Sequence, residues 1–199
     1  MKIDIHDIKF WMDAIRNSED KERTLESFWD GQIKSKLWLI EALEKHKSIR
    51  NADCVIHGGW NGVLACMMFN SELGIKHITS IDIDPKCKEI ASTMNKRYEM
   101  EGKFESVTSD MCDYEYKREP YFVINTSCEH IADFDTWYNK IPSGKIVILQ
   151  SNNYIGLPEH VNCSKTLKDF NNKTPMQEVL FQGELYLDKY SRYMRIGVK

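Results

Sequence analysis

Short apolar runs rich in β-branched residues alternate along the chain with longer segments whose apolar side chains recur every three or four positions. The first pattern predicts a buried strand and the second an amphipathic helix. We expect strands at residues 52–57, 77–83, 104–107, 121–125 and 145–150. Helices are expected at residues 4–17, 22–47, 85–100 and 133–140. Gly31 interrupts the second helical segment, which is either one long helix with a weak point or two helices with a turn at Asp30 and Gly31.

The pattern changes near the end of the chain. From Gln177 to Lys199, polar and apolar residues alternate in two stretches, EVLFQGELYLD and SRYMRIGVK, as is typical of an antiparallel strand pair. Strands that alternate with helices indicate an α/β fold with ligand-binding loops at the carboxyl ends of its strands. We therefore predict a doubly wound, mostly parallel seven-stranded sheet with a C-terminal antiparallel strand pair and N-terminal helices. At 199 residues the chain fits a single domain, with a helical extension at 1–50 and a core at 51–199.

Composition and charge restrict the partners. The hydrophobic fraction of 42% is ordinary for a soluble globular protein, and no apolar run approaches the roughly 20 residues that span a bilayer. The N-terminal segment carries acidic residues where a secretory signal would carry basic ones, so we expect a cytoplasmic protein. The six cysteines form no C-x-x-C pair and are expected to be reduced. The formal net charge of -3 favours a small-molecule partner, leaves a nucleic acid open but not favoured, and gives no reason to expect membrane binding.

Two predicted strands end on residues that suit a nucleoside ligand. The first strand stops at the turn 58–62, Gly-Gly-Trp-Asn-Gly, before the next helix. The second ends on Asp82 and Asp84, followed by Pro85, which suits the first turn of a helix. Asp84 is the better N-cap because it directly precedes Pro85, which leaves Asp82 for a ligand. An acid about 20 residues after a glycine turn is positioned to meet ribose hydroxyls in nucleotide-binding α/β folds.

With these motifs in this order, the sequence resembles the class I S-adenosylmethionine-dependent methyltransferases, which have a Rossmann-like fold. The matching segments are Gly58 to Gly62, Ser80 to Pro85 and Ser109 to Met111. The resemblance implies a transferase in which the glycine turn approaches the methionine part of S-adenosyl-L-methionine and Asp82 binds the ribose. It further implies that Asp110 lies near the adenine amino group. The cofactor-binding residues expected on this basis are Gly58, Gly59, Trp60, Gly62, Asp82, Ile83, Asp110, Met111 and Asn125.

Two positions depart from the family pattern. Trp60 stands where the family has the middle glycine of its G-x-G-x-G turn. Ile56 stands where the family usually has an acid, with His57 beside it. Because tryptophan cannot leave the backbone bare, we expect the turn either to follow a different path or to place the indole ring over the ligand.

The later strand ends are unusually polar and are the candidate acceptor site. Methyl transfer requires an aligned acceptor and, where the acceptor must lose a proton, a base. Two Glu-His pairs, at 129–130 and 159–160, fall on loops that we expect to converge. We predict that Glu129 or His130 is the general base, since a histidine near pKa 6.5 can accept a proton at neutral pH. The residues predicted to orient a small polar acceptor are Asn125, Asn152, Asn153, Tyr154 and His160.

Other functions fit the same sequence. The chain could be a non-catalytic S-adenosylmethionine- or nucleotide-binding protein or a partner subunit, or an enzyme that uses S-adenosylmethionine for other chemistry, such as aminocarboxypropyl transfer. A methyltransferase acting on RNA or protein also stays open. The N-P-P-Y signature of amino-directed DNA methylation is absent at the end of the fourth predicted strand, where N-T-S-C stands. That difference counts against DNA as the substrate.

Three further clusters have alternative interpretations. A zinc site would need both polar loops to meet, but the ligand spacing fits no zinc signature, so we expect no metal. Its candidate ligands are Cys128, His130, His160 and Cys163. Polar residues before the first strand could bind the cofactor carboxylate, namely Gln32, Lys34 and Lys36. An aromatic and basic cluster could meet a nucleic acid, although such residues are more often the exposed face of a final hairpin: Tyr186, Tyr190, Arg192, Tyr193 and Arg195.

Overall fold

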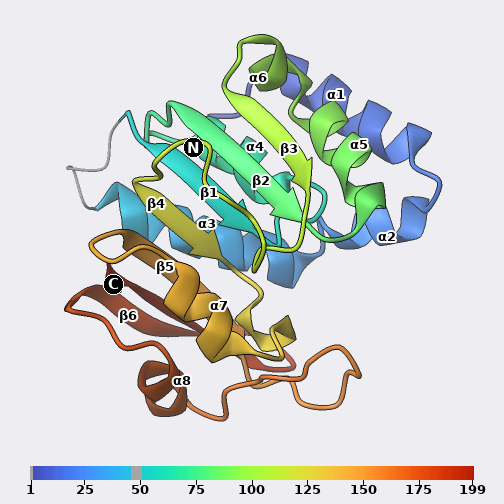
Figure 1. Ribbon diagram of the computed structural model, residues 1–199. Coiled ribbons are helices and arrows are strands. Elements are labelled where there is room, and N and C mark those ends of the chain that lie inside the picture. The colour runs from blue at the N-terminus through green and yellow to red at the C-terminus, as the bar shows by residue number, and fades with distance from the viewer. Residues whose placement is uncertain (1, 46–50) are drawn as a thin grey trace. The chain divides into compact units, whose positions relative to one another are not determined.

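The computed structural model describes residues 2–45 and 51–199 (Figure 1). The chain divides into two compact units, one extending to Glu119 and the other comprising Pro120–Lys199. Each unit has its own strands and helices, and each carries one of the two candidate sites.

The first unit begins with three helices, α1 (Ile5–Asn17), α2 (Lys21–Glu26) and α3 (Asp30–Glu44). The segment 22–47 is expected to be one long helix or two helices, and the structure has two. Residues 46 and 47 lie outside the described residues. The break falls at 27–29 and not at Gly31, which is buried inside α3. Ser27 explains this position, because its hydroxyl donates to the carbonyl oxygen of Thr24 at 2.6 Å and competes with helical pairing.

Three parallel strands form the sheet of the first unit, in the order β3-β2-β1. They are β1 (Asp53–His57), β2 (His77–Asp82) and β3 (Phe104–Thr108). Helix α4 (Val63–Phe69) follows β1, and α5 (Pro85–Met94) and α6 (Lys96–Met100) follow β2. The single helix predicted at 85–100 is therefore divided at Asn95. The side-chain amide of Asn95 donates to the carbonyl oxygens of Ala91 and Gly62, both at 3.0 Å, and fixes the break.

Helix α1 is fastened to this unit by a buried carboxylate. Asp7 is 1% exposed, and its Oδ2 accepts hydrogen bonds from Asn70 Nδ2 and Tyr98 Oη, both at 2.7 Å. Figure 1 shows α1 running alongside α5, with which it is in contact. Because both donors are buried as well, this network fixes where the N-terminal helix lies on the unit.

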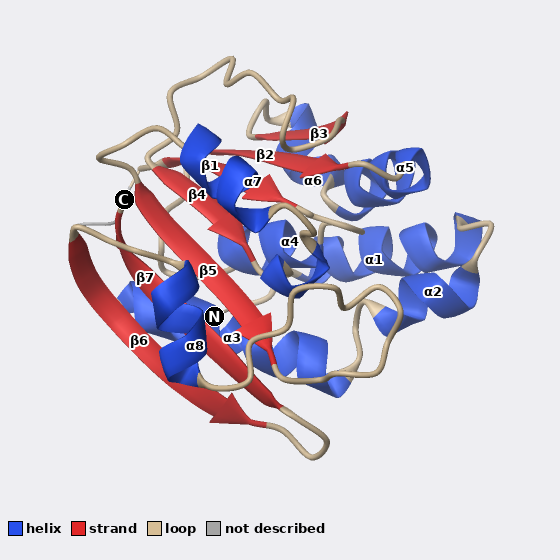
Figure 2. Ribbon diagram, turned by 60° about the horizontal axis from the view of Figure 1, so that its bottom comes forward, coloured by secondary structure: helices blue, strands red, loops and turns tan. Residues whose placement is uncertain are grey.

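The second unit contains four strands in the order β4-β5-β7-β6 (Figure 2). Strands β4 (Phe122–Asn125) and β5 (Ile146–Asn152) are parallel, whereas β6 (Glu178–Tyr186) and β7 (Ser191–Val198) form the predicted antiparallel pair. A short 3₁₀ helix, η1 (Cys128–His130), and α7 (Phe134–Lys140) connect β4 to β5. Strand β5 includes Ser151 and Asn152, which the sequence pattern assigned to the following loop.

Helix α8 (Leu167–Lys173) precedes β6 and was not predicted. Its sequence, LKDFNNK, is polar apart from two residues, and only Phe170 is buried. The hydroxyl of Thr166 caps it by accepting from the backbone N–H of Asp169 at 3.1 Å. A seven-residue helix with one buried side chain has too little periodicity to be recognised from sequence.

The predicted fold class is confirmed: residues 2–45 and 51–199 contain seven strands in a mostly parallel α/β arrangement, a C-terminal antiparallel pair and N-terminal helices. Strand interiors supply the core of each unit, with Ile78 and Ile81 in the first and Val147 and Ile148 in the second all 0% exposed. Among the helices of the described residues, none is long and apolar enough to cross a membrane.

Candidate functional site

The glycine turn connects the end of β1 to the start of α4. Gly58 and Gly62 have φ angles of 67° and 76°, in the left-handed region that favours glycine. Gly62 is also the N-cap of α4. Trp60, which replaces the family's middle glycine, has a φ of 47°, an uncommon value for a bulky residue. The turn therefore keeps a left-handed backbone at Trp60 without a glycine, a local strain of the kind found at ligand sites.

Asp82 holds this turn in place. Its Oδ2 accepts a hydrogen bond from the backbone N–H of Trp60 at 2.8 Å, and its Oδ1 accepts from the backbone N–H of Asp84 at 3.0 Å. The parallel register pairs His57 with Ile81, which brings the end of β1 beside the end of β2. Asp82 is partly exposed, and each carboxylate oxygen retains capacity for a further hydrogen bond.

Asp84 has the capping role predicted for it. Its Oδ1 accepts from the backbone N–H of Lys86 at 3.0 Å at the start of α5, and its Oδ2 lies 2.6 Å from Arg23 Nη1. The Lys86 N–H and, after it, the Arg23 guanidinium hold the pKa of Asp84 below its usual value. The two neighbouring acids are thus divided between helix capping and support of the glycine turn.

Two buried polar side chains adjoin the turn. Asn61 is 1% exposed, yet neither its Oδ1 nor its Nδ2 has a hydrogen-bond partner among the described residues. His57 stacks on Tyr116 with ring centroids 6.0 Å apart, and burial lowers its pKa to about 4, so it is neutral at pH 7. Ile56 is 1% exposed. An apolar side chain therefore stands where the methyltransferase family usually has an acid, and a neutral imidazole is next to it.

The remaining cofactor candidates of the first unit follow β2 and β3. Ile83 is 68% exposed and offers an apolar surface next to Asp82. The backbone N–H of Ser109 donates to the carbonyl oxygen of Asp82 at 3.0 Å, so the segment after β3 adjoins the end of β2. Asp110 is exposed, and its Oδ1 accepts from the backbone N–H of Cys112 at 2.7 Å. Met111 is partly exposed beside it.

The two left-handed glycines of the turn should differ in their tolerance of a side chain. A Cβ on Gly62 would lie 2.6 Å from Asn95 Nδ2 and 3.1 Å from Ala91 Cα, whereas a Cβ on Gly58 would have no atom of the described residues within 4 Å. We expect Gly62→Ala to lower the free energy of unfolding by about 2–4 kcal/mol, from left-handed strain plus overpacking, and Gly58→Ala by about 1 kcal/mol. Urea denaturation measures both, and equal losses would contradict the packing at Gly62.

The N-terminal polar residues are occupied within α3. Lys36 is 6% exposed, and its Nζ donates to Gln32 Oε1 at 2.6 Å. Lys34 Nζ lies 2.7 Å from Asp30 Oδ2. Both lysine side chains thus interact with other residues of α3. A contact between these lysines and the cofactor stays a prediction.

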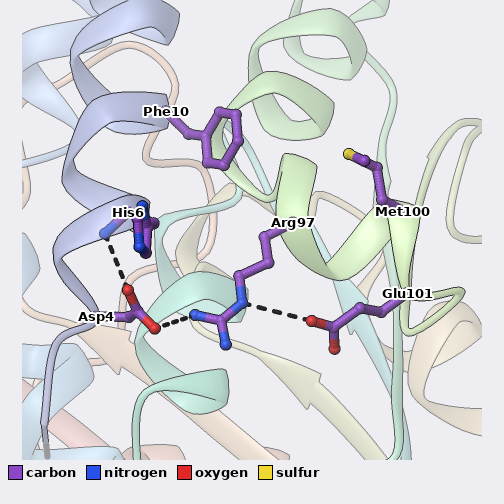
Figure 3. A pocket seen from close by; sticks show the side chains of 6 residues that line it. All are labelled: Asp4, His6, Phe10, Arg97, Met100 and Glu101. Carbon is purple, nitrogen blue, oxygen red and sulfur yellow. Dashed lines mark hydrogen bonds and ion pairs between the residues drawn. The ribbon is translucent and has the colours of Figure 1, made fainter.

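A pocket of about 590 Å³ lies beside the start of α1 and the end of α6 (Figure 3). Arg97 crosses it between Asp4 and Glu101, with Nε 3.4 Å from Glu101 Oε1. The backbone N–H of Asp4 donates to Asn70 Oδ1 at 2.9 Å, which places this pocket at the C-terminal end of α4. The glycine turn is at the opposite end of that helix, so the pocket and the predicted cofactor residues are separate features.

The polar cluster of the second unit is built at the carboxyl ends of β4 and β5. The antiparallel register pairs Asn152 of β5 with Arg192 of β7, so both reach the same edge of the sheet. Glu129, in η1 after β4, is 1% exposed. Its Oε1 accepts from Asn152 Nδ2 at 2.6 Å and lies 3.4 Å from Arg192 Nη2. Its other oxygen, Oε2, is buried and has no hydrogen-bond partner among the described residues.

Arg192 corrects one expectation from the sequence. The C-terminal aromatic and basic cluster is predicted as the exposed face of a hairpin or a nucleic-acid surface. Tyr186 is 78% exposed and agrees with this, but Arg192, Tyr193 and Arg195 are only 3%, 1% and 5% exposed. Arg192 Nη1 donates to the carbonyl oxygen of Thr126 at 2.7 Å, in addition to its contact with Glu129. These side chains are buried because β7 lies between β5 and β6, which the sequence pattern alone did not reveal.

The loops carrying the two Glu-His pairs meet. The rings of His130 and His160 are 4.8 Å apart between centroids and perpendicular. His130 Nδ1 lies 3.1 Å from the carbonyl oxygen of Glu159, and His160 Nδ1 lies 2.7 Å from that of Tyr154. The backbone N–H of Asn162 donates to the carbonyl oxygen of Glu129 at 2.8 Å and ties the two segments together.

The other predicted acceptor residues serve these loops. Asn153 Oδ1 accepts from the backbone N–H of Ser191, and Asn125 Oδ1 accepts from that of Ser127, both at 2.8 Å. Tyr154 stacks on Tyr190 with ring centroids 5.4 Å apart. Their side chains therefore shape the loops around Glu129, and the assignment of Asn125 to the cofactor stays a prediction.

The set of potential metal ligands differs from the one considered in the sequence. Cys128 is buried with its Sγ toward the carbonyl oxygen of Asn125 at 3.7 Å, and Cys163 Sγ lies 3.6 Å from Asn152 Oδ1. The group of close ligand atoms found in the described residues contains Glu129, His130 and His160 instead. A carboxylate thus takes the place of the two thiols in this cluster.

Solved structures share this fold at low sequence identity. The N-methyltransferase NodS from Bradyrhizobium japonicum in complex with S-adenosyl-L-homocysteine matches 94% of this chain and 97% of its own, with a TM-score of 0.67 and 12% identity. A structure from Galdieria sulphuraria that is provisionally assigned as a sarcosine dimethylglycine methyltransferase matches 84% of this chain and 86% of its own, with a TM-score of 0.66 and 9% identity. The structure of MtNAS in complex with MTA and tNA matches 96% of this chain and 69% of its own, with a TM-score of 0.56 and 14% identity.

These similarities confirm the resemblance to class I S-adenosylmethionine-dependent methyltransferases at the level of the fold. No protein-family model matches the sequence, and no curated protein sequence matches it. At these identities the solved structures establish the fold of this chain and not its activity.

Proposed function

We propose that this protein is an S-adenosylmethionine-dependent methyltransferase acting on a small polar acceptor. The observation that carries the proposal is the 2.8 Å hydrogen bond from the Trp60 N–H to Asp82 Oδ2. It joins the glycine turn after β1 to the acid at the end of β2, the two segments expected to hold the methionine and ribose parts of the cofactor. The similarity of the fold to methyltransferase structures supports the same assignment.

The residues at this end of the first unit fit such a cofactor. Asp82 can accept hydrogen bonds from ribose hydroxyls with the capacity left on its oxygens. Asn61 has a buried amide without a partner in the described part of the chain, and a buried polar group of this kind calls for a ligand or water. A Cβ on Gly58 would meet no atom of the described residues within 4 Å, and exposed Ile83 offers an apolar face for a flat base. Asp110 and Met111 would complete the adenine side.

The second unit supplies the groups for an acceptor. When bound, S-adenosylmethionine provides a methyl group on a positively charged sulfur, open to in-line attack. The protein must align the acceptor and, where needed, take its proton. Glu129 or His130 would take that proton, because Glu129 Oε2 accepts no hydrogen bond from any described residue and His130 is exposed. The residues that would orient the acceptor are Asn152, Asn153, Tyr154 and His160.

Burial of two basic residues favours a small acceptor over a nucleic acid. Arg192 and Arg195 are buried in the second unit, where they bond to backbone carbonyl oxygens. They therefore contribute nothing to a cationic surface of the kind that binds phosphate backbones. The net charge of -3 agrees with this choice of substrate class.

Transfer of labelled methyl groups from S-adenosylmethionine to pooled small amines, alcohols and carboxylic acids tests the proposal. We expect labelled product together with S-adenosylhomocysteine. Whichever of Glu129→Gln and His130→Ala removes the base should lower turnover by about 100-fold or more. Lys168→Ala, on the exposed side of α8, is the control and should leave turnover unchanged.

The products separate this function from its alternatives. Methylthioadenosine in place of S-adenosylhomocysteine would indicate aminocarboxypropyl transfer. Cofactor binding with no product from small molecules, RNA or protein would indicate a binding protein. Unchanged turnover in both Glu129→Gln and His130→Ala would reject these residues as the base.

A further inference from the structure

The geometry points to a binding site for one divalent first-row transition-metal ion formed by Glu129, His130 and His160. One potential ligand atom from each of these residues lies within 4.8 Å of the others. All three belong to the second unit, Glu129 and His130 in η1 after β4 and His160 in the loop after β5. The inference rests on contacts inside residues 120–199 and not on methyl transfer, so a failed methyl-transfer assay leaves it intact, whereas an ion at this site would exclude Glu129 and His130 as the proton acceptor.

The carboxylate of Glu129 has one oxygen available for a ligand. Oε1 is used by Asn152 at 2.6 Å and Arg192 at 3.4 Å. Oε2 is buried in a residue that is 1% exposed, and it has no hydrogen-bond partner in the part of the chain that the structure describes. A buried carboxylate oxygen without a donor is costly in a folded protein. A metal ion at Oε2 would remove that cost.

Both histidines have the arrangement that metal-binding imidazoles require. His130 Nδ1 lies against the Glu159 carbonyl oxygen at 3.1 Å and His160 Nδ1 against the Tyr154 carbonyl oxygen at 2.7 Å. A carbonyl oxygen only accepts hydrogen bonds, so each Nδ1 carries the proton and donates it. The lone pair of each ring is then on Nε2, where it can coordinate an ion. Hydrogen bonding of the second ring nitrogen to a backbone carbonyl is the usual outer support of a metal-bound histidine.

The loops bearing these ligands are held together without an ion. The Asn162 N–H donates to the Glu129 carbonyl oxygen at 2.8 Å, and Lys173 Nζ donates to Asn162 Oδ1 at 3.0 Å. Metal–ligand bonds of about 2.0–2.2 Å require ligand atoms roughly 3–3.5 Å apart. Ligand atoms that lie as far apart as 4.8 Å must therefore approach one another by about 1–2 Å. The exposed side chain of His130 has room for that movement.

The donor set selects the class of ion. Two imidazole nitrogens and one carboxylate oxygen suit zinc, manganese, iron and cobalt in their divalent states, whereas magnesium and calcium prefer oxygen ligands alone. Three protein ligands leave coordination positions open for water or an acceptor atom. Arg192 neutralises Glu129 from the Oε1 side, so we expect binding in the micromolar range and not tighter. With an ion bound, Glu129 and His130 act as ligands and no longer as proton acceptors.

Calorimetric titration of the chelator-treated, full-length protein with ZnCl₂, and the visible spectrum with CoCl₂, test this site. We expect one ion per chain and the absorption bands of protein-bound Co²⁺. His160→Ala and Glu129→Gln should each weaken Zn²⁺ binding roughly 100-fold. Loss of a direct ligand should lower the affinity at least as much as loss of a residue that only hydrogen-bonds to a ligand. His6→Ala, which removes an exposed histidine of the first unit, is the matched control and should bind as the wild type does.

Two results would overturn the inference. One is the absence of stoichiometric binding to wild-type protein at millimolar Zn²⁺. The other is wild-type affinity in His160→Ala with an unchanged circular dichroism spectrum. Cys163→Ala tests whether the third metal ligand is the Glu129 carboxylate or a thiol. We expect this variant to bind Zn²⁺ with an affinity within a few-fold of the wild type. Loss of Zn²⁺ binding in this variant alone would reject Glu129 as the third ligand. Because His160 is only partly buried, its variant should fold even if Glu129→Gln does not.

Discussion

Asp82→Ala is expected to lower the affinity for S-adenosylhomocysteine about 100-fold, because hydrogen bonds to a charged group contribute roughly 1.5–3 kcal/mol and tenfold corresponds to about 1.4 kcal/mol. The substitution removes the acceptor proposed for the ribose. It also releases the Trp60 N–H, which Asp82 Oδ2 now holds at 2.8 Å. Isothermal titration calorimetry of the variant and the wild type measures the difference.

Asp84→Ala is the matched control for this prediction. Asp84 caps α5 and pairs with Arg23, so its loss should cost about 1 kcal/mol of stability and change cofactor affinity by less than a few-fold. Equal loss of affinity in both variants would mean that Asp82 acts only through the local backbone. Unchanged affinity in Asp82→Ala would remove the ribose assignment.

Arg192→Met is expected to lower the free energy of unfolding by about 3–5 kcal/mol, because removing one partner of a buried ion pair leaves an uncompensated charge. Arg192 and Glu129 are 3% and 1% exposed, and Arg192 also bonds to the Thr126 carbonyl oxygen. Denaturation by urea, followed by circular dichroism, measures the loss.

The double variant Glu129→Gln/Arg192→Met provides the control. Once the carboxylate is neutral, removal of the guanidinium should cost less than it does in the wild type, and the difference gives the coupling between the two side chains. A loss below about 1 kcal/mol in Arg192→Met would instead mean that Glu129 is stabilised by its other contacts.

The sequence was sufficient for the fold because its signals are local. The β-branched runs predict the strands to within two residues at most ends, and Asp84 before Pro85 predicts the cap that the structure has. The spacing between the glycine turn and Asp82 also anticipated that these segments would be neighbours. Helix breaks were harder to predict, because Ser27 and Asn95 act through single side-chain hydrogen bonds that leave no periodic trace.

The candidate sites were only partly predictable. Convergence of the two Glu-His loops could be predicted, because the carboxyl ends of parallel strands lie at the same edge of a sheet. The contact between Glu129 and Arg192 could not be predicted. Arg192 is far away in sequence and reaches Glu129 only because β7 pairs with β5 in the register that sets Arg192 against Asn152. The sequence does not single out Asn61 for a similar reason, because a polar residue in a turn gives no sign that its amide is buried and lacks a partner among the described residues.

The most direct test of the account is a crystal structure of the wild-type protein with S-adenosylhomocysteine, at a concentration where calorimetry gives one bound molecule per chain. We predict the ribose hydroxyls within hydrogen-bonding distance of the Asp82 carboxylate, with the adenine ring against Ile83 and the amino acid part at the turn 58–62. A nucleoside bound elsewhere, with no ligand atom in contact with Asp82, would contradict the central claim.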